Sequence, residues 1–312
     1  MKNLYNMRLN PNIKTGLQLI VLVYCGVVMA LYFLQSHLIF RAGFRIPNLA
    51  ESQLPRLREV RIPTLLNENC FAADADPAGC TSREYGYLTS WFAHPLIPSK
   101  PMVLYLHGNG GTIQYRRGIA KQFLDAGYGL LMLEYRGYGG NPGKPSHDGL
   151  AYDARAAMEF LREKFGTRSK IYIYGESIGG AVAIQMLAKN TDIAADGLVL
   201  YAPFTNLADV IKNLYPWLPI DWILRYQFDN LQFIGQLRVP ILVMHGAADH
   251  FVPPNMGRAV YDAANDPKEL YMVDNANHYT LWDMGGTARA IDFINRAHAG
   301  LPVGGVIGGV GQ

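Results

Sequence analysis

The sequence predicts an α/β fold, a mostly parallel sheet with helices on both faces. Short apolar runs alternate with segments whose apolar residues recur every three or four positions, which is the pattern of strands followed by helices. The runs cover residues 102–106, 129–133, 171–174, 198–201, 241–244 and 270–273. Because they are apolar along their whole length, they are typical of strands buried on both faces of a parallel sheet. Ligands of such sheets bind at the carboxyl ends of the strands.

The composition bounds the possible functions. Of the 312 residues, 50% are hydrophobic and 17% are charged, which supplies the core of one large domain and excludes disorder over most of the length. The 28 Lys and Arg residues against 25 Asp and Glu residues give a net charge of +3, too balanced for binding nucleic acid through phosphate contacts. Three cysteines cannot form a disulfide scaffold, and their spacing matches no zinc site.

Residues 1–41 predict a short tail and one membrane anchor. No Asp, Glu, Lys or Arg lies between residues 16 and 40, and the apolar run 17–34 is interrupted only by Gln18 and Gly26. This length matches the roughly 20 residues that a helix needs to cross a bilayer, so we expect one span near residues 17–38. A cleaved signal peptide with its site at residues 28–30 is the alternative. The apolar run continues through residue 34, which favours retention.

The orientation of the span is not decided by its flanks, because basic residues lie on both sides of it. A short cationic tail is difficult to translocate, so we expect the main domain outside the cytoplasm. Cys70 and Cys80 favour the same side, because they could pair in an oxidising compartment. Two unrelated thiols remain the alternative for these two residues.

The segments after the anchor divide into a connector, a domain and a tail. Residues 42–83 are a polar, Pro-rich connector, and residues 84–300 are the α/β domain, which opens with antiparallel edge strands at 84–93. Helical patterns follow at residues 152–165, 178–187, 257–264 and 287–298. The connection 204–237 is long and rich in aromatic residues, which predicts a short helical lid. We expect the Gly-rich tail, residues 301–312, to be flexible.

A nucleophile is predicted where the strand at 171–174 passes into a helix. Residues 175–180 read Gly-Glu-Ser-Ile-Gly-Gly, which matches the nucleophile elbow of G-x-S-x-G enzymes, with Ser177 at its centre. Glycines permit the sharp turn that lifts the serine hydroxyl to the top of the sheet. The following helix points its positive end at any negative charge that forms there. A plain glycine-rich turn is the alternative.

A serine hydroxyl needs a base that is oriented by an acid, and this fold fixes the chain order as Ser, acid, His. Asp249 follows the run 241–244 and His278 follows the run 270–273, so both come to the same sheet edge as Ser177. Asp209 is the fallback acid. We expect His250 to be a loop residue and His245 to pack a turn.

Residues 107–111, His-Gly-Asn-Gly-Gly, follow the first central strand and present backbone N–H groups to the site. We expect the N–H groups of Asn109 and Ile178 to form an oxyanion hole. The alternative, a phosphate-binding loop, lacks the Lys-Ser/Thr ending of such loops. Glu134, in the glycine-rich segment that follows the strand at 129–133, is interpreted as an ion-pair partner near this loop.

These segments together resemble the α/β-hydrolase superfamily, and within it the membrane-anchored serine hydrolases related to the alpha/beta-hydrolase domain-containing proteins. The resemblance covers roughly residues 84–298 and also includes residues 135–139 and 204–205 with Val252 and Pro253. It implies an α/β-hydrolase fold and the hydrolysis of esters, thioesters or lipid acyl chains. Two residues depart from the family pattern: Asn277 stands where a glycine commonly precedes the histidine, and Glu134 stands where Asp is usual.

The sequence thus predicts a serine hydrolase that works through an acyl-enzyme with Ser177, His278 and Asp249, without metal or organic cofactor. A serine peptidase and an inactive scaffold of the same fold are the alternatives. We expect a small-molecule or lipid acyl-ester substrate, with four apolar lid residues near the pocket mouth. They are Leu218, Trp222, Leu224 and Tyr226. The alternative is that these residues pack the lid onto the sheet.

Overall fold

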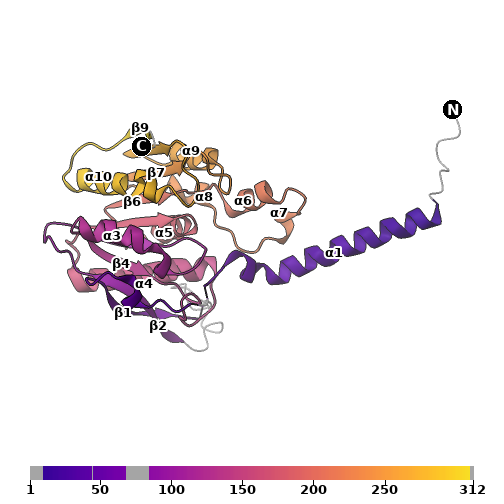
Figure 1. Ribbon diagram of the computed structural model, residues 1–312, viewed down its shortest axis with the longest axis horizontal. Coiled ribbons are helices and arrows are strands. Elements are labelled where there is room, and N and C mark those ends of the chain that lie inside the picture. The colour runs from indigo at the N-terminus through magenta and orange to yellow at the C-terminus, as the bar shows by residue number, and fades with distance from the viewer. Residues whose placement is uncertain (1–9, 44, 68–83, 310–312) are drawn as a thin grey trace.

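The computed structural model describes residues 10–43, 45–67 and 84–309 and shows one central sheet covered by helices on both faces, with a long helix projecting from it (Figure 1). Cys70 and Cys80 lie outside the described residues. The sheet order is β1-β2-β4-β3-β5-β6-β7-β8-β9. The strands are β1 (Arg58–Leu65), β2 (Tyr85–Ala93), β3 (Met102–Leu106), β4 (Gly129–Leu133), β5 (Ile171–Glu176), β6 (Gly197–Tyr201), β7 (Ile241–Gly246), β8 (Lys268–Val273) and β9 (Gly305–Gly309).

The fold is the expected α/β-hydrolase fold with a mostly parallel sheet. Strands β3 to β9 run parallel to one another, while β1 pairs antiparallel with β2, and β2 antiparallel with β4. The central strands β3, β4 and β6 are buried at every residue, as their continuous apolar sequences predict. This parallel order brings the carboxyl ends of β5, β7 and β8 to one edge.

Helices cover the two faces of the sheet in separate groups. On one face lie α4 (His147–Phe165), α5 (Ile178–Lys189) and α9 (Pro254–Ala263), which share a core with the β3 and β5 side chains of that face. On the other face lie α3 (Arg117–Asp125) and α10 (Thr287–His298). Ser146 caps the start of α4 by accepting a hydrogen bond from the Gly149 N–H at 2.9 Å.

Two segments outside the predicted domain join the sheet. Residues 58–65 of the expected connector form the edge strand β1, and residues 305–309 of the tail form β9 on the opposite edge. The expectation of a flexible tail is therefore wrong for residues 305–309. Pairing in β9 uses backbone groups alone, so a Gly-rich sequence without apolar alternation can still supply a strand.

The helix α1 (Pro11–Ile39) is capped by Asn10, whose side chain accepts a hydrogen bond from the Asn12 N–H at 3.0 Å. Its 29 residues extend about 44 Å and pass the length and composition test for a candidate membrane span. In Figure 1 it projects from the body, and its inner end lies beside the 204–237 insertion. That insertion carries three short helices, α6 (Leu207–Leu214), α7 (Ile220–Ile223) and α8 (Asn230–Ile234).

Candidate active site

Ser177 lies in the turn between β5 and α5 with a positive φ of 52° and a ψ of −114°. This conformation is strained for a residue with a side chain. Glycines make the turn possible: a Cβ on Gly175 would lie 2.5 Å from Gly180 Cα, and one on Gly179 would lie 2.1 Å from Leu106 O. The flanking glycines therefore let strand and helix approach closely enough to hold the serine in this turn.

Asp249 and His278 lie in the turns that follow β7 and β8, and their side chains meet. His278 Nδ1 lies 2.7 Å from Asp249 Oδ2, while Oδ1 of Asp249 accepts hydrogen bonds from the N–H groups of Phe251 and Val252 at 2.9 and 2.8 Å. Burial raises the pKa of Asp249, but hydrogen bonds from His245 and His278 outweigh it and hold the pKa well below its ordinary value. The carboxylate is thus ionised and accepts from His278 Nδ1, and in a neutral imidazole of this tautomer Nε2 is the acceptor.

The turn that carries His278 is fixed by two further contacts. The Tyr201 hydroxyl donates to the His278 carbonyl at 2.9 Å. The side chain of Asn277 accepts hydrogen bonds from the N–H groups of Tyr279 and Thr280 at 2.9 and 3.1 Å, so it closes the turn. Asn277 thus takes a structural role in this turn and does not have a positive φ.

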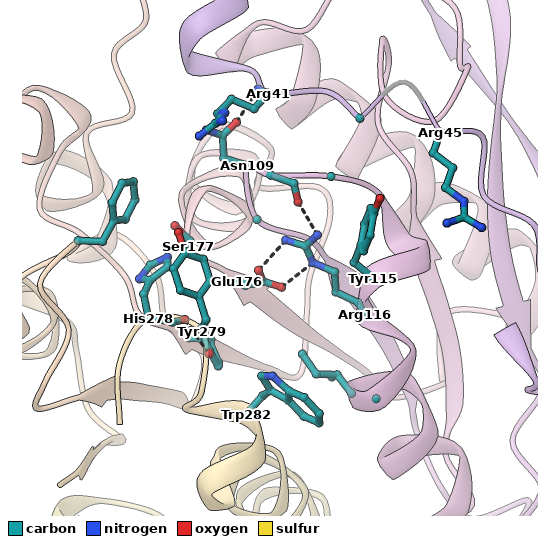
Figure 2. A pocket seen from close by; sticks show the side chains of 18 residues that line it. Arg41, Arg45, Asn109, Tyr115, Arg116, Glu176, Ser177, His278, Tyr279 and Trp282 are labelled. Atoms are coloured by element: carbon teal, nitrogen blue, oxygen red, sulfur yellow. Dashed lines mark hydrogen bonds and ion pairs between the residues drawn. The ribbon is translucent and has the colours of Figure 1, made fainter. Parts of the chain in front are cut away.

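Ser177 and His278 face the same cavity, which has a volume of about 550 Å³ (Figure 2). Its other walls come from the 108–111 loop, from the start of α3, from the 279–282 segment and from the chain that follows α1. The volume lies in the range of sites for small molecules. Arg41 and Arg45 line the side nearest α1, and Arg45 pairs with Glu51.

Asn109 lies in the loop after β3 and lines the Ser177 cavity, and Ile178, the first residue of α5, directly follows Ser177 in the chain. In the described part of the chain, no hydrogen bond uses either of these two N–H groups. The Asn109 side chain is engaged elsewhere: its Oδ1 accepts from the Arg41 N–H at 3.1 Å and from the Tyr138 hydroxyl at 3.3 Å. The loop is therefore tied to the chain that leaves α1.

Sequence reasoning missed an ion pair that joins the nucleophile turn to this loop. Arg116 Nη2 lies 2.8 Å from Oε1 of Glu176, the residue before Ser177, and Arg116 Nη1 donates to the Gly110 carbonyl (Figure 2). The Tyr105 hydroxyl donates to the other carboxylate oxygen. Burial raises the pKa of Glu176, but Arg116 and Tyr105 outweigh it and lower the pKa to about 2. The sequence signal for this ion pair was Glu176 itself, a carboxylate next to Ser177 at the end of an otherwise apolar strand.

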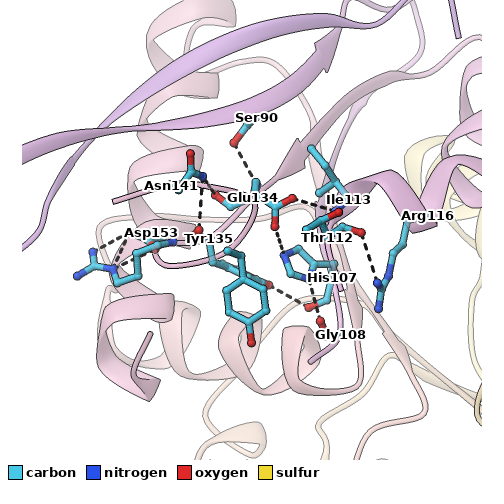
Figure 3. A network of polar contacts seen from close by, with 12 residues as sticks. Ser90, His107, Gly108, Thr112, Ile113, Arg116, Glu134, Tyr135, Asn141 and Asp153 are labelled. Atoms are coloured by element: carbon cyan, nitrogen blue, oxygen red, sulfur yellow. Dashed lines mark hydrogen bonds and ion pairs between the residues drawn. The ribbon is translucent and has the colours of Figure 1, made fainter. Parts of the chain in front are cut away.

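Glu134 contacts the beginning of the same loop (Figure 3). Its Oε1 lies 3.1 Å from Nε2 of the fully buried His107, and its Oε2 accepts from the Ile113 N–H at 2.9 Å. The backbone N–H of Glu134 donates to the Ser90 hydroxyl at 3.1 Å. Glu134 thus bridges the two ends of residues 107–113 and lies within ion-pair distance of the His107 ring.

The alternative residues lie elsewhere. Asp209 accepts hydrogen bonds at 2.6 Å from Thr205 and Asn206 at the start of α6, so it belongs to a helix cap. His250 is exposed. His245 is completely buried and its Nε2 lies 2.9 Å from the Val252 carbonyl and 3.5 Å from Asp249 Oδ2, so it contacts the acid as well as packing a turn.

None of the four expected lid residues is among the described residues that line the Ser177 cavity. Leu218 and Leu224 line a second cavity beside α1, and Trp222 is 88% exposed. Tyr226 packs its ring on Phe40, with centroids 5.0 Å apart. The placement of these four residues at the mouth of the Ser177 cavity is therefore wrong, because three of them lie against α1 or the residue that follows it and Trp222 is exposed. Within residues 10–43, 45–67 and 84–309, no three His, Cys, Asp or Glu side chains form a group that could hold a metal ion.

Comparison with known proteins identifies the family of the chain. The family model described as "Serine aminopeptidase, S33" matches residues 97–235, and a model of PhoPQ-activated pathogenicity-related proteins matches residues 222–304. An uncharacterised protein of Mycobacterium tuberculosis is 35% identical over 263 residues, which are 83% of this chain and 86% of that protein. A lysophosphatidylserine lipase, ABHD12 of Danio rerio, is 30% identical over 211 residues. The chain belongs to the α/β-hydrolase superfamily and is related to its ABHD members.

The match to the Danio rerio lipase covers 62% of this chain and 55% of the lipase. Among solved structures, an esterase of Pyrococcus furiosus aligns with a TM-score of 0.62 at 19% identity, over 82% of this chain and 98% of the esterase. That likeness shows the shared fold. The relatives named as lipases and esterases support a hydrolase.

Proposed function

We propose that this protein is a serine hydrolase that cleaves carboxylic ester or thioester bonds through a catalytic triad of Ser177, His278 and Asp249. The observation that carries the proposal is the 2.7 Å contact between His278 Nδ1 and an ionised Asp249, in the cavity that also holds the strained Ser177. The relatives named as lipases and esterases support the same chemistry.

In the proposed reaction, Ser177 Oγ attacks the carbonyl carbon while His278 Nε2 takes the hydroxyl proton. The electron pair of the carbonyl bond moves to the oxygen, and the N–H groups of Asn109 and Ile178 stabilise the resulting oxyanion. Collapse breaks the bond to the leaving alcohol or thiol, which receives the proton from His278, and water then hydrolyses the acyl-enzyme by the same steps. Each oxyanion donor contributes about 2.7–4 kcal/mol in enzymes of this kind.

A fluorophosphonate probe tests the nucleophile. We expect labelling of the full chain and none in Ser177→Ala. Asp249→Asn should lower kcat by about 10⁴-fold, because the imidazole then adopts the wrong tautomer. Asp209→Asn is the matched control and should retain activity, since it lies in a helix cap. Absence of labelling in folded wild-type protein would favour an inactive scaffold.

Amide cleavage is the second candidate, because the matching family model is described as a serine aminopeptidase. A panel of p-nitrophenyl esters beside peptide p-nitroanilides separates the two. Faster turnover of the anilides would replace the esterase proposal with a peptidase.

We also propose that α1 crosses a membrane once and that the hydrolase domain lies outside the cytoplasm. The apolar, exposed outer half of α1 supports the span. Carbonate extraction should leave the full chain in the membrane fraction. Protease added outside intact cells should cleave the domain, and protection until the membrane is opened would place it in the cytoplasm.

A further inference from the structure

The inner part of α1 is fastened to the 204–237 insertion by hydrogen bonds at two levels. The Tyr24 hydroxyl donates to the Trp217 carbonyl at 3.0 Å. One turn from the end of α1, the buried Gln35 donates to the Ile223 carbonyl at 3.0 Å and accepts from the Arg225 N–H at 2.8 Å. The few polar side chains of this apolar helix therefore hold the insertion against the helix.

A cavity of about 540 Å³ remains between α1 and the insertion. Most of its lining is aliphatic, and the volume lies in the range of sites for small ligands. The aliphatic lining residues are Val27, Leu31, Leu38, Ile39, Ile211, Leu218, Ile220, Ile223 and Leu224. The amide of Gln35, the most buried polar side chain among them, is already occupied by backbone groups.

The position of this cavity relates it to both the membrane and the site. Tyr215 and Trp217 line this cavity, and Trp222 belongs to α7, which also contributes to the lining. The three side chains are 50%, 55% and 88% exposed near a candidate membrane span, which is typical of aromatic side chains at a bilayer interface. On its inner side, Arg41 lines this cavity and the Ser177 cavity alike. Arg41 is thus the residue at which the two cavities adjoin.

We propose that the cavity between α1 and the insertion binds the acyl chain of the substrate, which enters from the bilayer. The inference rests on the proposed ester hydrolysis at Ser177 and identifies where the acyl portion lies. The ester carbonyl then reaches Ser177 past Arg41, and the leaving group occupies the more polar cavity. The insertion is the wall of an acyl site that is shared with the membrane helix, not a lid over the serine.

Filling the cavity from either side tests the proposal. Leu31→Trp on α1 and Leu218→Trp on the insertion should each lower the ratio of kcat/KM for p-nitrophenyl dodecanoate to that for the acetate by about tenfold or more, since each methylene in an apolar pocket is worth roughly 10–200-fold in specificity. Leu34→Trp is the matched control: Leu34 is 53% exposed on the same helix and is not among the lining residues. An unchanged ratio in both filled variants, or an equal fall in the control, would overturn the proposal.

Photo-crosslinking separates this inference from the proposed function. The full-length Ser177→Ala protein in detergent micelles is irradiated with dodecanoic acid that carries a diazirine. We expect crosslinks in the peptides of residues 207–224, suppressed by excess dodecanoate and by Leu31→Trp but not by Leu34→Trp. Crosslinks in a protein whose wild type neither cleaves esters nor binds fluorophosphonate would refute the hydrolase and keep the acyl site. Ester cleavage without crosslinks at these peptides would refute the acyl site alone.

Discussion

Neutralising Glu176 should destabilise the fold in a pH-dependent way. The pKa of this carboxyl falls from 4.5 to about 2 in the folded chain, and its side chain is only 17% exposed. A tenfold change in proton affinity corresponds to about 1.4 kcal/mol, so the ionised form contributes about 3 kcal/mol near neutral pH. Glu176→Gln removes that contribution and leaves the Arg116 guanidinium without its carboxylate, a change that commonly costs about 3–5 kcal/mol in buried pairs.

The sign of the pH dependence follows from the lowered pKa. A carboxylate of this kind stabilises the fold above its unfolded-state pKa and loses the contribution as the pH falls toward its folded-state pKa. The stability difference between wild type and Glu176→Gln should therefore be about 3 kcal/mol near pH 7 and smaller by about 2 kcal/mol near pH 3.

Urea unfolding of the full chain in detergent, followed by tryptophan fluorescence, measures this difference. Glu159→Gln is the control, because Glu159 pairs with Arg155 at 2.9 Å but is 55% exposed. Such surface pairs contribute about 0–1 kcal/mol. Equal stability of wild type and Glu176→Gln near neutral pH, or a difference that does not shrink on acidification, would refute the role assigned to the Arg116–Glu176 pair.

Three further predictions address the turns around the site. At a φ of 52°, Ser177→Gly should be more stable than Ser177→Ala by about 1 kcal/mol in thermal unfolding, the reverse of the usual order; a less stable glycine variant would argue against strain. Asn109→Ala removes the acceptor for the Arg41 N–H, so kcat for p-nitrophenyl acetate should fall about tenfold with KM unchanged, and an unchanged kcat would contradict that tie. Gly179→Ala should destabilise the fold by more than about 3 kcal/mol or prevent folding, because its Cβ would lie 2.1 Å from a backbone oxygen, whereas Gly110→Ala meets nothing within 4 Å and should fold normally; equal stabilities would contradict the close packing.

The features that could be predicted from sequence are those that a few neighbouring residues determine. The strands follow from continuous apolar runs, and the turn at Ser177 follows from glycines that no other residue could replace there. The meeting of Asp249 and His278 follows from chain order, because parallel strands deliver their carboxyl ends to one edge. Each of these placements could be predicted from the local sequence and the fold class alone.

Contacts between distant segments could not be predicted in this way. Arg116 and Glu176 are separated by 60 residues, and no local pattern marks Arg116 as the partner of the carboxylate. The association of α1 with the insertion was also missed, because the near absence of polar residues in α1 was interpreted only as membrane character. Gln35 was the relevant exception: a polar side chain near the end of an apolar helix requires a partner when it is buried.

The chain segment that follows α1 is short and is held in place by backbone contacts. Arg41 follows the last residue of α1, Ile39, by two residues, or at most about 8 Å of chain, and already lines the Ser177 cavity. The Gly111 N–H donates to the Arg41 carbonyl at 3.3 Å, and Ala42 forms a parallel bridge with Gly111. Whatever fixes α1 in place therefore also sets the height and tilt of the Ser177 cavity relative to that helix. Cleavage of the chain near residue 40 would release the α/β domain from α1 and leave the loop at Gly111 without its connection to the helix.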